Sequence, residues 1–482
     1  MPAKIRIGES CFTMENRNQM LFSRKAIAKI IAPMILQGIL SIAIGMVDSM
    51  MVSNKGEAAF AGVSLVGSLD TLLITLFSSL TSGGAVVLAQ AVGRDDQKRA
   101  CDAAKQLWYA ATIVATVITA TVLLLRIPLL HLLFGEVEES VMQNAIAYFS
   151  FVALSFPFLA IENSVSATFR AQGDSMIALK ISLFMNLLNI GGNAILIYGM
   201  NLGAAGAAIA TLISRVIGAL LMTVIAHRKT RFIYLENLFH YRPDFAIIKE
   251  ILRIGIPNGV ENSMFQFGRL MTSSLVSSLG TVAIAANAAA LSLANLQYTT
   301  GNAIQSTMVA VVGRCIGAEK RDQAKHYARS LLGIGYAALF VVVGLMSLFS
   351  APLLRLYGLS GETAALARQL LLYHGAVSVV IWPVAFCLPN AFRAASDVRF
   401  SMIISTVSMW AFRVALGYVL ALETVSIFQL VSFPGMGLGV MGVWIAMTVD
   451  WLFRAVFFLI RFLSGGWLAK YDAQHLKSPE TV

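Results

Sequence analysis

The sequence predicts an all-α polytopic membrane protein, with about twelve transmembrane helices in two pseudo-symmetric six-helix lobes. Three observations lead to this prediction: an apolar composition, an alternation of basic and non-basic loops, and an internal repeat. Of the 482 residues, 57% are hydrophobic and only 13% are charged, and the mean hydropathy is +0.75. Soluble domains carry about 25% charged residues, so the composition excludes an ordinary soluble protein.

Twelve apolar segments are long enough to cross a bilayer, which takes roughly 20 residues per helix. They lie near residues 26–52, 58–91, 107–126, 142–169, 175–200, 204–226, 247–278, 282–312, 330–350, 364–391, 399–421 and 438–461. Several of them exceed the thickness of the hydrocarbon core, so we expect tilted helices or helices that extend beyond the membrane.

Lysine and arginine are concentrated in every second loop. The N-terminal segment and the loops at 93–106, 227–246 and 314–329 are strongly basic. The alternate loops carry only Lys55, Arg126 and Arg355. Basic loops stay in the cytoplasm, so we expect a multi-pass protein of a prokaryotic plasma membrane with both termini inside. The same pattern accounts for the formal charge of +11, and we expect the lipid bilayer, not nucleic acid, as the partner.

The chain repeats itself after about 224 residues. Pro33 falls on Pro257, PLLHL (128–132) falls on PLLRL (352–356), and FRAQGD (169–174) falls on FRAASD (392–397) after a one-residue slip. Two parallel repeats of six spans are typical of secondary transporters, which bind substrate between the halves. The expected parts are a cytoplasmic N-terminal segment (1–25), an N-terminal lobe (26–226), a cytoplasmic linker (227–246), a C-terminal lobe (247–463) and a cytoplasmic tail (464–482).

Motifs that bind nucleotides or support hydrolysis are missing from the sequence. It has no GxxxxGK[ST] segment for phosphates and no HExxH, GxSxG or SxxK motif. We therefore expect neither an enzyme nor a cofactor, and no certain metal site. Energy for transport would then come from a gradient of H⁺ or Na⁺ across the membrane, and the sequence does not distinguish the two.

An ordered set of motifs resembles the multidrug and toxic compound extrusion (MATE) family. The set comprises GMVDSMMVS (45–53), SGGAVVLAQAVGRDD (82–96), NLLNIGGNAILIYG (186–199), GIPNGVENSMFQFGRL (255–270) and VVGRCIGAEKRDQAK (311–325), together with the two FRA segments. The resemblance covers roughly residues 25–465. It implies two six-helix lobes, a central cavity, and antiport of organic cations against protons or sodium ions.

Asp48 is the first candidate for a functional residue, because an ionisable group inside a span is costly and functional by default. It lies about 34 Å along the first span at 1.5 Å per residue, with no basic residue within a helical turn. Desolvation penalises its ionised form, so it could bind and release a proton, or ligate Na⁺ beside neutral oxygens. The plainer alternative is an aspartate at a helix end that faces water.

The resemblance also implies further site residues in the N-terminal lobe. Ion-coupling residues of the family fall on Asp48, Asn189, Asn193 and Thr211, and substrate or cavity residues fall on Tyr148 and Asn163. The same four ion-coupling residues are a possible Na⁺ site. Some members have a second aspartate at the position of Asn193, so two-carboxylate schemes are in doubt here. The alternative for the asparagines is a role in helix packing.

Two other acids lie inside spans of the first lobe. Asp70 lies near the middle of the second span and could line the cavity or pair with Arg215. Glu162 lies beside Asn163 and could be a second acid of the cavity or an ordinary lumen-facing group.

A cluster of charged residues occurs in the spans of the second lobe: Glu261, Arg269, Arg413, Asp450 and Arg454. Asp450 and Arg454 are four residues apart and so share one helix face. Two acids and three arginines indicate either a structural ion-pair network or a substrate or ion site, and the sequence leaves both open.

The resulting expectation is a monomeric secondary-active multidrug efflux antiporter that exports amphipathic cationic small molecules in exchange for H⁺ or Na⁺. The alternative is a flippase of the same superfamily for lipid-linked precursors or polysaccharides. Such a flippase needs a cationic cavity for a pyrophosphate group, whereas the intramembrane charges of the first lobe are mostly acidic.

Overall fold

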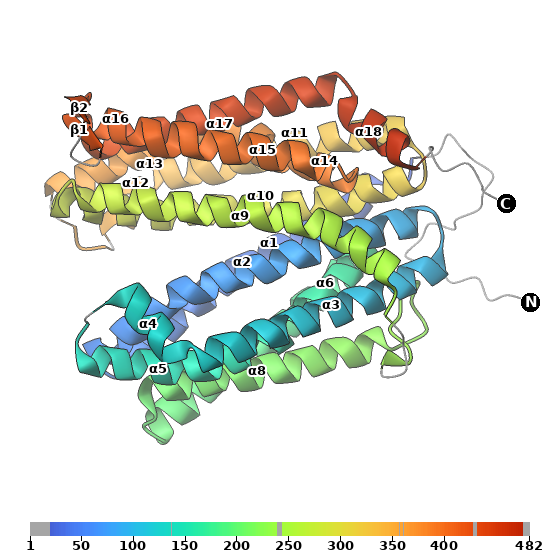
Figure 1. The fold of residues 1–482 in the computed structure, drawn as a ribbon, viewed down its shortest axis with the longest axis horizontal. Coiled ribbons are helices and arrows are strands. Elements are labelled where there is room, and N and C mark those ends of the chain that lie inside the picture. The colour runs from blue at the N-terminus through green and yellow to red at the C-terminus, as the bar shows by residue number, and fades with distance from the viewer. Residues whose placement is uncertain are drawn as a thin grey trace, which may run out of the picture.

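The computed structural model describes residues 20–135, 137–238, 243–355, 357–359, 361–427 and 431–475, which form a bundle of long helices in two lobes (Figure 1). Residues 1–19 of the expected N-terminal segment, residues 239–242 of the linker and residues 476–482 of the tail lie outside the described residues.

The first lobe, blue to green in Figure 1, contains eight α-helices and one π-helix. They are α1 (Arg24–Ser53), α2 (Glu57–Gly93), α3 (Gln97–Leu124), α4 (Arg126–Phe134), α5 (Glu139–Leu154), α6 (Phe156–Ala171), α7 (Ser175–Asn193), the π-helix η1 (Ala194–Gly199) and α8 (Gly203–Ala226).

The second lobe, yellow-green to red, begins at Phe245. Its helices are α9 (Phe245–Ser277), α10 (Thr281–Gly317), α11 (Arg321–Leu348), α12 (Ser350–Arg355), α13 (Gly361–Trp382), the π-helix η3 (Pro383–Cys387), α14 (Pro389–Ala394), α15 (Val398–Ser408), the π-helix η4 (Met409–Leu416), α16 (Gly417–Ala421), α17 (Gly439–Leu463) and α18 (Gly466–His475).

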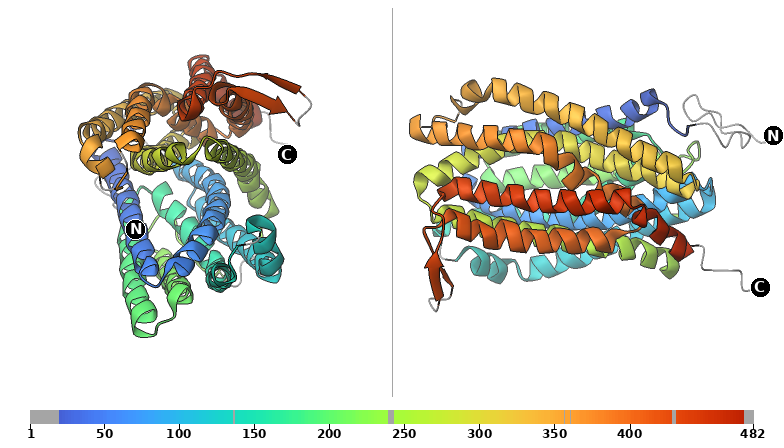
Figure 2. Two further views of the ribbon diagram at one scale, coloured as in Figure 1. Left: turned by 90° about the vertical axis from the view of Figure 1, so that its left-hand side faces the viewer. Right: turned by 90° about the horizontal axis from the view of Figure 1, so that it is seen from above.

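A short antiparallel hairpin follows α16 and protrudes from one end of the bundle (Figure 2). Its strands are β1 (Thr424–Ile427) and β2 (Val431–Pro434), and Thr424 pairs with Pro434. The β-branched residues of the two strands favour an extended conformation. We call this end the hairpin end, and the opposite end, where α18 ends, the terminal end.

Nine described helices are long and apolar enough to cross a membrane, or ten if the bent pair α5 and α6 counts as one span. The expected number of twelve is thus not reached by this criterion and stays a prediction. The other two candidates are α9, with 33 residues, and α10, with 37. Each exceeds the roughly 20 residues that a span needs, but both carry polar residues that face the central cavity described below, which lowers their hydropathy.

The span expected at 142–169 is broken in the structure. Helices α5 and α6 meet at Ser155 with a bend of 44°, and Pro157 lies in the first turn of α6. Proline has no backbone N–H and clashes with the carbonyl four residues earlier, which is a common cause of kinks.

Helices α2 and α10 come into close backbone contact at the terminal end, at two glycines. Gly93 and Gly317 end these helices and are matched by the 224-residue repeat. A Cβ atom at Gly93 would lie 2.2 Å from the backbone oxygen of Arg314, and one at Gly317 would lie 2.0 Å from that of Gln90. A side chain at either position would therefore separate the lobes.

Hydrogen bonds join the lobes in the same half of the bundle. The Gln90 amide donates to the carbonyl of Ala394 at 2.7 Å, and the Arg314 guanidinium donates to the carbonyl of Ala171 at 2.7 Å. The lobes are thus tied together at the terminal end.

Candidate functional site

A central cavity of about 570 Å³ lies between the two lobes. Its walls come from α2, α6, α9, α10 and α14, so both lobes contribute. The polar residues that line it are mostly amides and hydroxyls: Thr75, Ser78, Thr81, Ser82, Asn163, Asn258, Asn262, Asn302, Gln305, Ser306 and Asn390, joined by Arg170 and Arg393. Among the described residues, no carboxylate lines this cavity.

Of the N-terminal site residues expected from the sequence, Asn163 alone lines the central cavity. Its amide nitrogen is buried and has no hydrogen-bond partner among the described residues. Asn163 therefore presents a free donor beside the cavity, apart from the group that surrounds Asp48.

The structure brings Asp48 together with the two asparagines of α7. Asn189 and Asn193 are four residues apart on α7 and so lie on one face, and α1 packs against α7. The amide nitrogen of Asn193 donates to Asp48 Oδ1 at 2.8 Å. With its amide nitrogen turned toward Asp48, Asn189 donates to both carboxylate oxygens at 3.0 Å. Among the described residues, Asp48 has these neutral amide contacts and no ion pair.

Thr211 completes this group from α8. In the same orientation, the Asn189 oxygen accepts from the Thr211 hydroxyl at 3.2 Å. Asn193 is 1% exposed, and its oxygen Oδ1 is buried with no hydrogen-bond partner among the described residues. Two carboxylate oxygens, an unused amide oxygen and a hydroxyl are the ligand types that hard cations prefer.

Asp70 was expected either to line the cavity or to pair with Arg215, and in the structure it lies beside Arg215. Asp70 Oδ2 lies 3.6 Å from the Arg215 guanidinium. Arg215 also donates to Ser155 Oγ at 2.7 Å, at the break between α5 and α6. Asp70 therefore belongs to an ion pair that supports the bent helix, and it does not line the cavity.

Tyr148 and Glu162 lie outside both groups. Tyr148 packs against a small apolar cluster that includes Val52 and Ile197. Glu162 precedes the cavity residue Asn163 on α6 but does not itself line the cavity.

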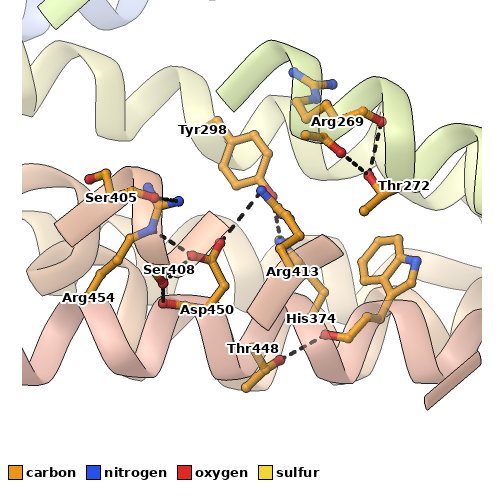
Figure 3. A network of polar contacts seen from close by, with 12 residues as sticks. Arg269, Thr272, Tyr298, His374, Ser405, Ser408, Arg413, Thr448, Asp450 and Arg454 are labelled. Atoms are coloured by element: carbon orange, nitrogen blue, oxygen red, sulfur yellow. Dashed lines mark hydrogen bonds and ion pairs between the residues drawn. The ribbon is translucent and has the colours of Figure 1, made fainter. Parts of the chain in front are cut away.

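In the second lobe, Asp450 is the centre of a buried polar network (Figure 3). It is fully buried and accepts from the Arg454 guanidinium at 2.8 Å and from the Ser408 hydroxyl at 2.5 Å. Arg413 lies farther away, with 3.9 Å between its Nη1 and Asp450 Oδ2. Arg269 lies on α9, across from this network, and its guanidinium points away from Asp450 in the view of Figure 3.

Glu261 does not belong to this network, which corrects the grouping expected from the sequence. It lies in the middle of α9 and pairs with Arg393 of α14 at 2.9 Å. The sequence analysis missed Arg393 as a functional candidate. A signal was present, because Arg393 of FRAASD repeats Arg170 of FRAQGD, and both arginines line the central cavity.

Comparisons with known proteins agree with this architecture. The MatE family model matches residues 33–195 and 257–419, two matches displaced by 224 residues. An uncharacterized transporter, YisQ, from Bacillus subtilis is 26% identical over 449 residues, which cover 91% of this chain and 94% of the relative. A probable multidrug resistance protein NorM from Thermotoga maritima is 26% identical over 452 residues, which cover 92% and 93%.

A solved structure supports the fold independently. The crystal structure of MATE in the bent conformation superposes with a TM-score of 0.83 at 22% identity, over 93% of this chain and 97% of the other. The two family matches together span well over half of the 482 residues. The chain therefore belongs to the MatE family, as a multi-pass membrane transporter with two lobes of helices.

Proposed function

We propose that this transporter is a secondary-active multidrug efflux antiporter, which exports organic cations in exchange for H⁺ or Na⁺. The environment of Asp48 carries the proposal, because its carboxylate is held by the amides of Asn189 and Asn193. A carboxylate with neutral partners keeps its negative charge available for a proton, a sodium ion or a cationic group. The relatives named as probable multidrug resistance proteins support the assignment to efflux.

Coupling would follow from competition for one negative charge. When an ion neutralises Asp48, the lobe no longer attracts a cationic substrate, and when the ion leaves, the attraction returns. The effect is reciprocal, so a bound substrate must weaken ion binding by the same factor. If the ion is Na⁺, the unused oxygen of Asn193 and the hydroxyl of Thr211 are the further ligands that the structure offers.

The membrane orientation that we propose follows from the distribution of basic loops. Since the basic loops lie at the terminal end, we place this end in the cytoplasm. The contacts between Gln90 and Ala394 then close the cytoplasmic side, and the transporter rests with its lobes joined inside. A single chain supplies both lobes and the whole cavity, so we propose a functional monomer.

The orientation can be tested by cysteine labelling in intact cells. The native cysteines at 101, 315 and 387 are buried, and the fourth, Cys11, is replaced by serine to keep the background low. A membrane-impermeant maleimide should label Val137→Cys, near the hairpin end, and spare Lys320→Cys, at the terminal end. The reverse labelling pattern would overturn the orientation.

A specific observation favours the second candidate, a flippase for lipid-linked precursors. Arg170 and Arg393 both line the central cavity, and arginine binds phosphate groups through paired hydrogen bonds. Arg393, however, already pairs with Glu261 at 2.9 Å, which offsets its charge. The antiporter therefore remains the better-supported proposal.

Accumulation of a fluorescent organic cation in cells tests the proposal and separates the candidates. Cells that make the wild-type protein should accumulate less of the cation than cells that make Asp48→Asn. Glu57→Gln, which changes an exposed acid in the first turn of α2, is the matched control and should export normally. If the wild type leaves cation accumulation unchanged but accelerates flipping of a fluorescent pyrophosphate lipid in vesicles, the flippase assignment is correct instead.

A further inference from the structure

A second, smaller cavity of about 110 Å³ lies inside the C-terminal lobe, toward the hairpin end. It is partly open and is lined by residues of α9, α10, η4 and α17. A water molecule takes up roughly 30 Å³ of the liquid, so this pocket has room for a small ion and a few waters. It is too small for a drug-sized compound, which needs roughly 300 Å³ or more.

The internal repeat relates this pocket to the site around Asp48. A displacement of 224 residues, the one that separates the two family matches, takes Asp48 to Thr272 and Asn189 to Arg413. Both Thr272 and Arg413 line the C-terminal pocket. The position that holds a carboxylate and a neutral amide in the first lobe therefore holds a hydroxyl and a guanidinium in the second.

Positive charge exceeds negative charge around the pocket. Arg269 and Arg413 line it, Arg454 lies behind it, and Asp450 is the one carboxylate of the network in Figure 3. In the part of the chain that the structure describes, no aspartate or glutamate lines the pocket. Three guanidinium groups against one carboxylate leave an excess of two positive charges.

Asp450 neutralises Arg413 only in part. Its Oδ1 is already used by Arg454 and Ser408, and its Oδ2 lies 3.9 Å from Arg413 Nη1. Arg413 is only 7% exposed, and its Nη1 has no hydrogen-bond partner among the described residues. The Arg413 guanidinium also lies 5.1 Å from the centre of the Phe265 ring. A buried cation that is only partly compensated is unfavourable, so a further negative charge in the pocket would stabilise it.

Neutral donors accompany the two arginines. Thr272 and Ser273 contribute hydroxyl groups from α9. The oxygen of Asn287 accepts from Trp444 Nε1 at 2.9 Å, which leaves the amide nitrogen of Asn287 as a donor. Guanidinium, hydroxyl and amide N–H groups together are the donors that bind an anion.

We propose that this C-terminal pocket binds a small monovalent anion, such as chloride, between Arg413 and Arg269. The anion supplies the negative charge that Asp48 supplies in the first lobe. The inference rests on the pocket and its charges and does not depend on the proposed antiport.

Thermal unfolding of the purified transporter in detergent tests the proposal with chloride as the probe. Ionic strength is held constant while gluconate, a much larger anion, is replaced by chloride. We expect a saturable rise in the unfolding midpoint of the wild type. Loss of one charge-assisted contact in Arg269→Gln should raise the chloride concentration at half effect by about tenfold or more.

Matched variants keep the test decisive. Arg269 and Arg253 are both exposed residues of α9, and Arg253 lines neither cavity, so Arg253→Gln should respond to chloride as the wild type does. Arg413→Gln should abolish the response, and Arg269→Gln replaces it as the test if Arg413→Gln fails to fold. Equal midpoints in chloride and gluconate for the wild type, or an unchanged chloride response in Arg269→Gln, would overturn the proposal.

Crystals grown in bromide give a direct second readout. The anomalous signal of bromide should appear within the pocket, between the two arginines, in the wild type and not in Arg269→Gln. Bromide bound only elsewhere on the protein would contradict the assignment.

Discussion

In the N-terminal lobe, Asp48 accepts hydrogen bonds from Asn189 and Asn193; in the C-terminal lobe, Thr272 and Arg413 occupy the positions matched to Asp48 and Asn189. Features that set the helix geometry are kept between the lobes, such as the prolines inside α1 and α9 and the crossing glycines of α2 and α10. The charges are not kept. The comparison suggests that packing constrains both repeats, whereas each lobe acquired its own electrostatic role.

The largest expected effect on stability concerns the network of the second lobe. Asp450→Asn removes the one carboxylate near Arg413 and Arg454 and leaves two buried cations unpaired. Breaking a buried pair in this way costs about 3–5 kcal/mol, so we expect a large fall in the unfolding midpoint in detergent. Glu362→Gln, in the first turn of α13, is the control, and equal stability of the two variants would show that the network is not structural.

Glu261→Gln should have the next largest effect. It leaves Arg393 without its partner at 2.9 Å. We expect a cost of about 2–3 kcal/mol, because Arg393 lines the cavity and both side chains keep some access to water. Expression and stability should fall while the ion dependence of transport remains. A stable Glu261→Gln protein with no ion coupling would move the coupling site to the second lobe.

Thr272→Asp places a carboxylate in the C-terminal pocket at the position that the repeat matches to Asp48. A fixed carboxylate at this position supplies the missing counter-charge, which should raise stability in gluconate by about 1.5 kcal/mol, comparable with one charged hydrogen bond. The variant should also lose its response to chloride. Thr272→Val is the matched control, and a chloride response in Thr272→Asp equal to that of the wild type would contradict the comparison of the lobes.

Asp70→Asn should have the smallest effect. Asp70 and Arg215 are 3.6 Å apart and partly accessible, and Arg215 keeps its hydrogen bond to Ser155. We expect a loss of about 1 kcal/mol and normal export, as measured by unfolding and by cation accumulation. Loss of export in a stable Asp70→Asn protein would make Asp70 part of the transport site.

The architecture could be predicted from the sequence because its signals are local. Hydropathy and loop charge depend on residues close together in the chain, and they predicted the multi-pass helical fold that the family match and the solved structure support. Two exceptions have physical causes. Polar residues facing the central cavity keep α9 and α10 below the hydropathy of ordinary spans. The bend at Ser155 could not be predicted from hydropathy, because the segment at 142–169 is apolar on both sides of it.

The candidate site could be predicted only in part, because the rotation of each helix about its axis is not encoded in spacing alone. The four-residue interval between Asn189 and Asn193 placed both on one face, and the structure puts Asp48 against that face. The grouping of Glu261 with the cluster around Asp450 was wrong, since Glu261 pairs with Arg393 of α14, whereas Arg269, two turns farther along α9, lines the pocket with Arg413. The pocket around Arg413 was missed because it involves four elements distant in the chain.

The measurement that tests the central claim most directly is gradient-driven transport of a fluorescent cation in proteoliposomes. An imposed pH or Na⁺ gradient should drive transport by the wild type and by Arg269→Gln, because the proposed coupling charge lies in the first lobe. Asp48→Asn should fold, since asparagine is nearly isosteric with aspartate, but it should lose the gradient dependence. If Asp48→Asn retains full gradient-driven transport, the coupling site lies elsewhere, and Glu261 is the next residue to test.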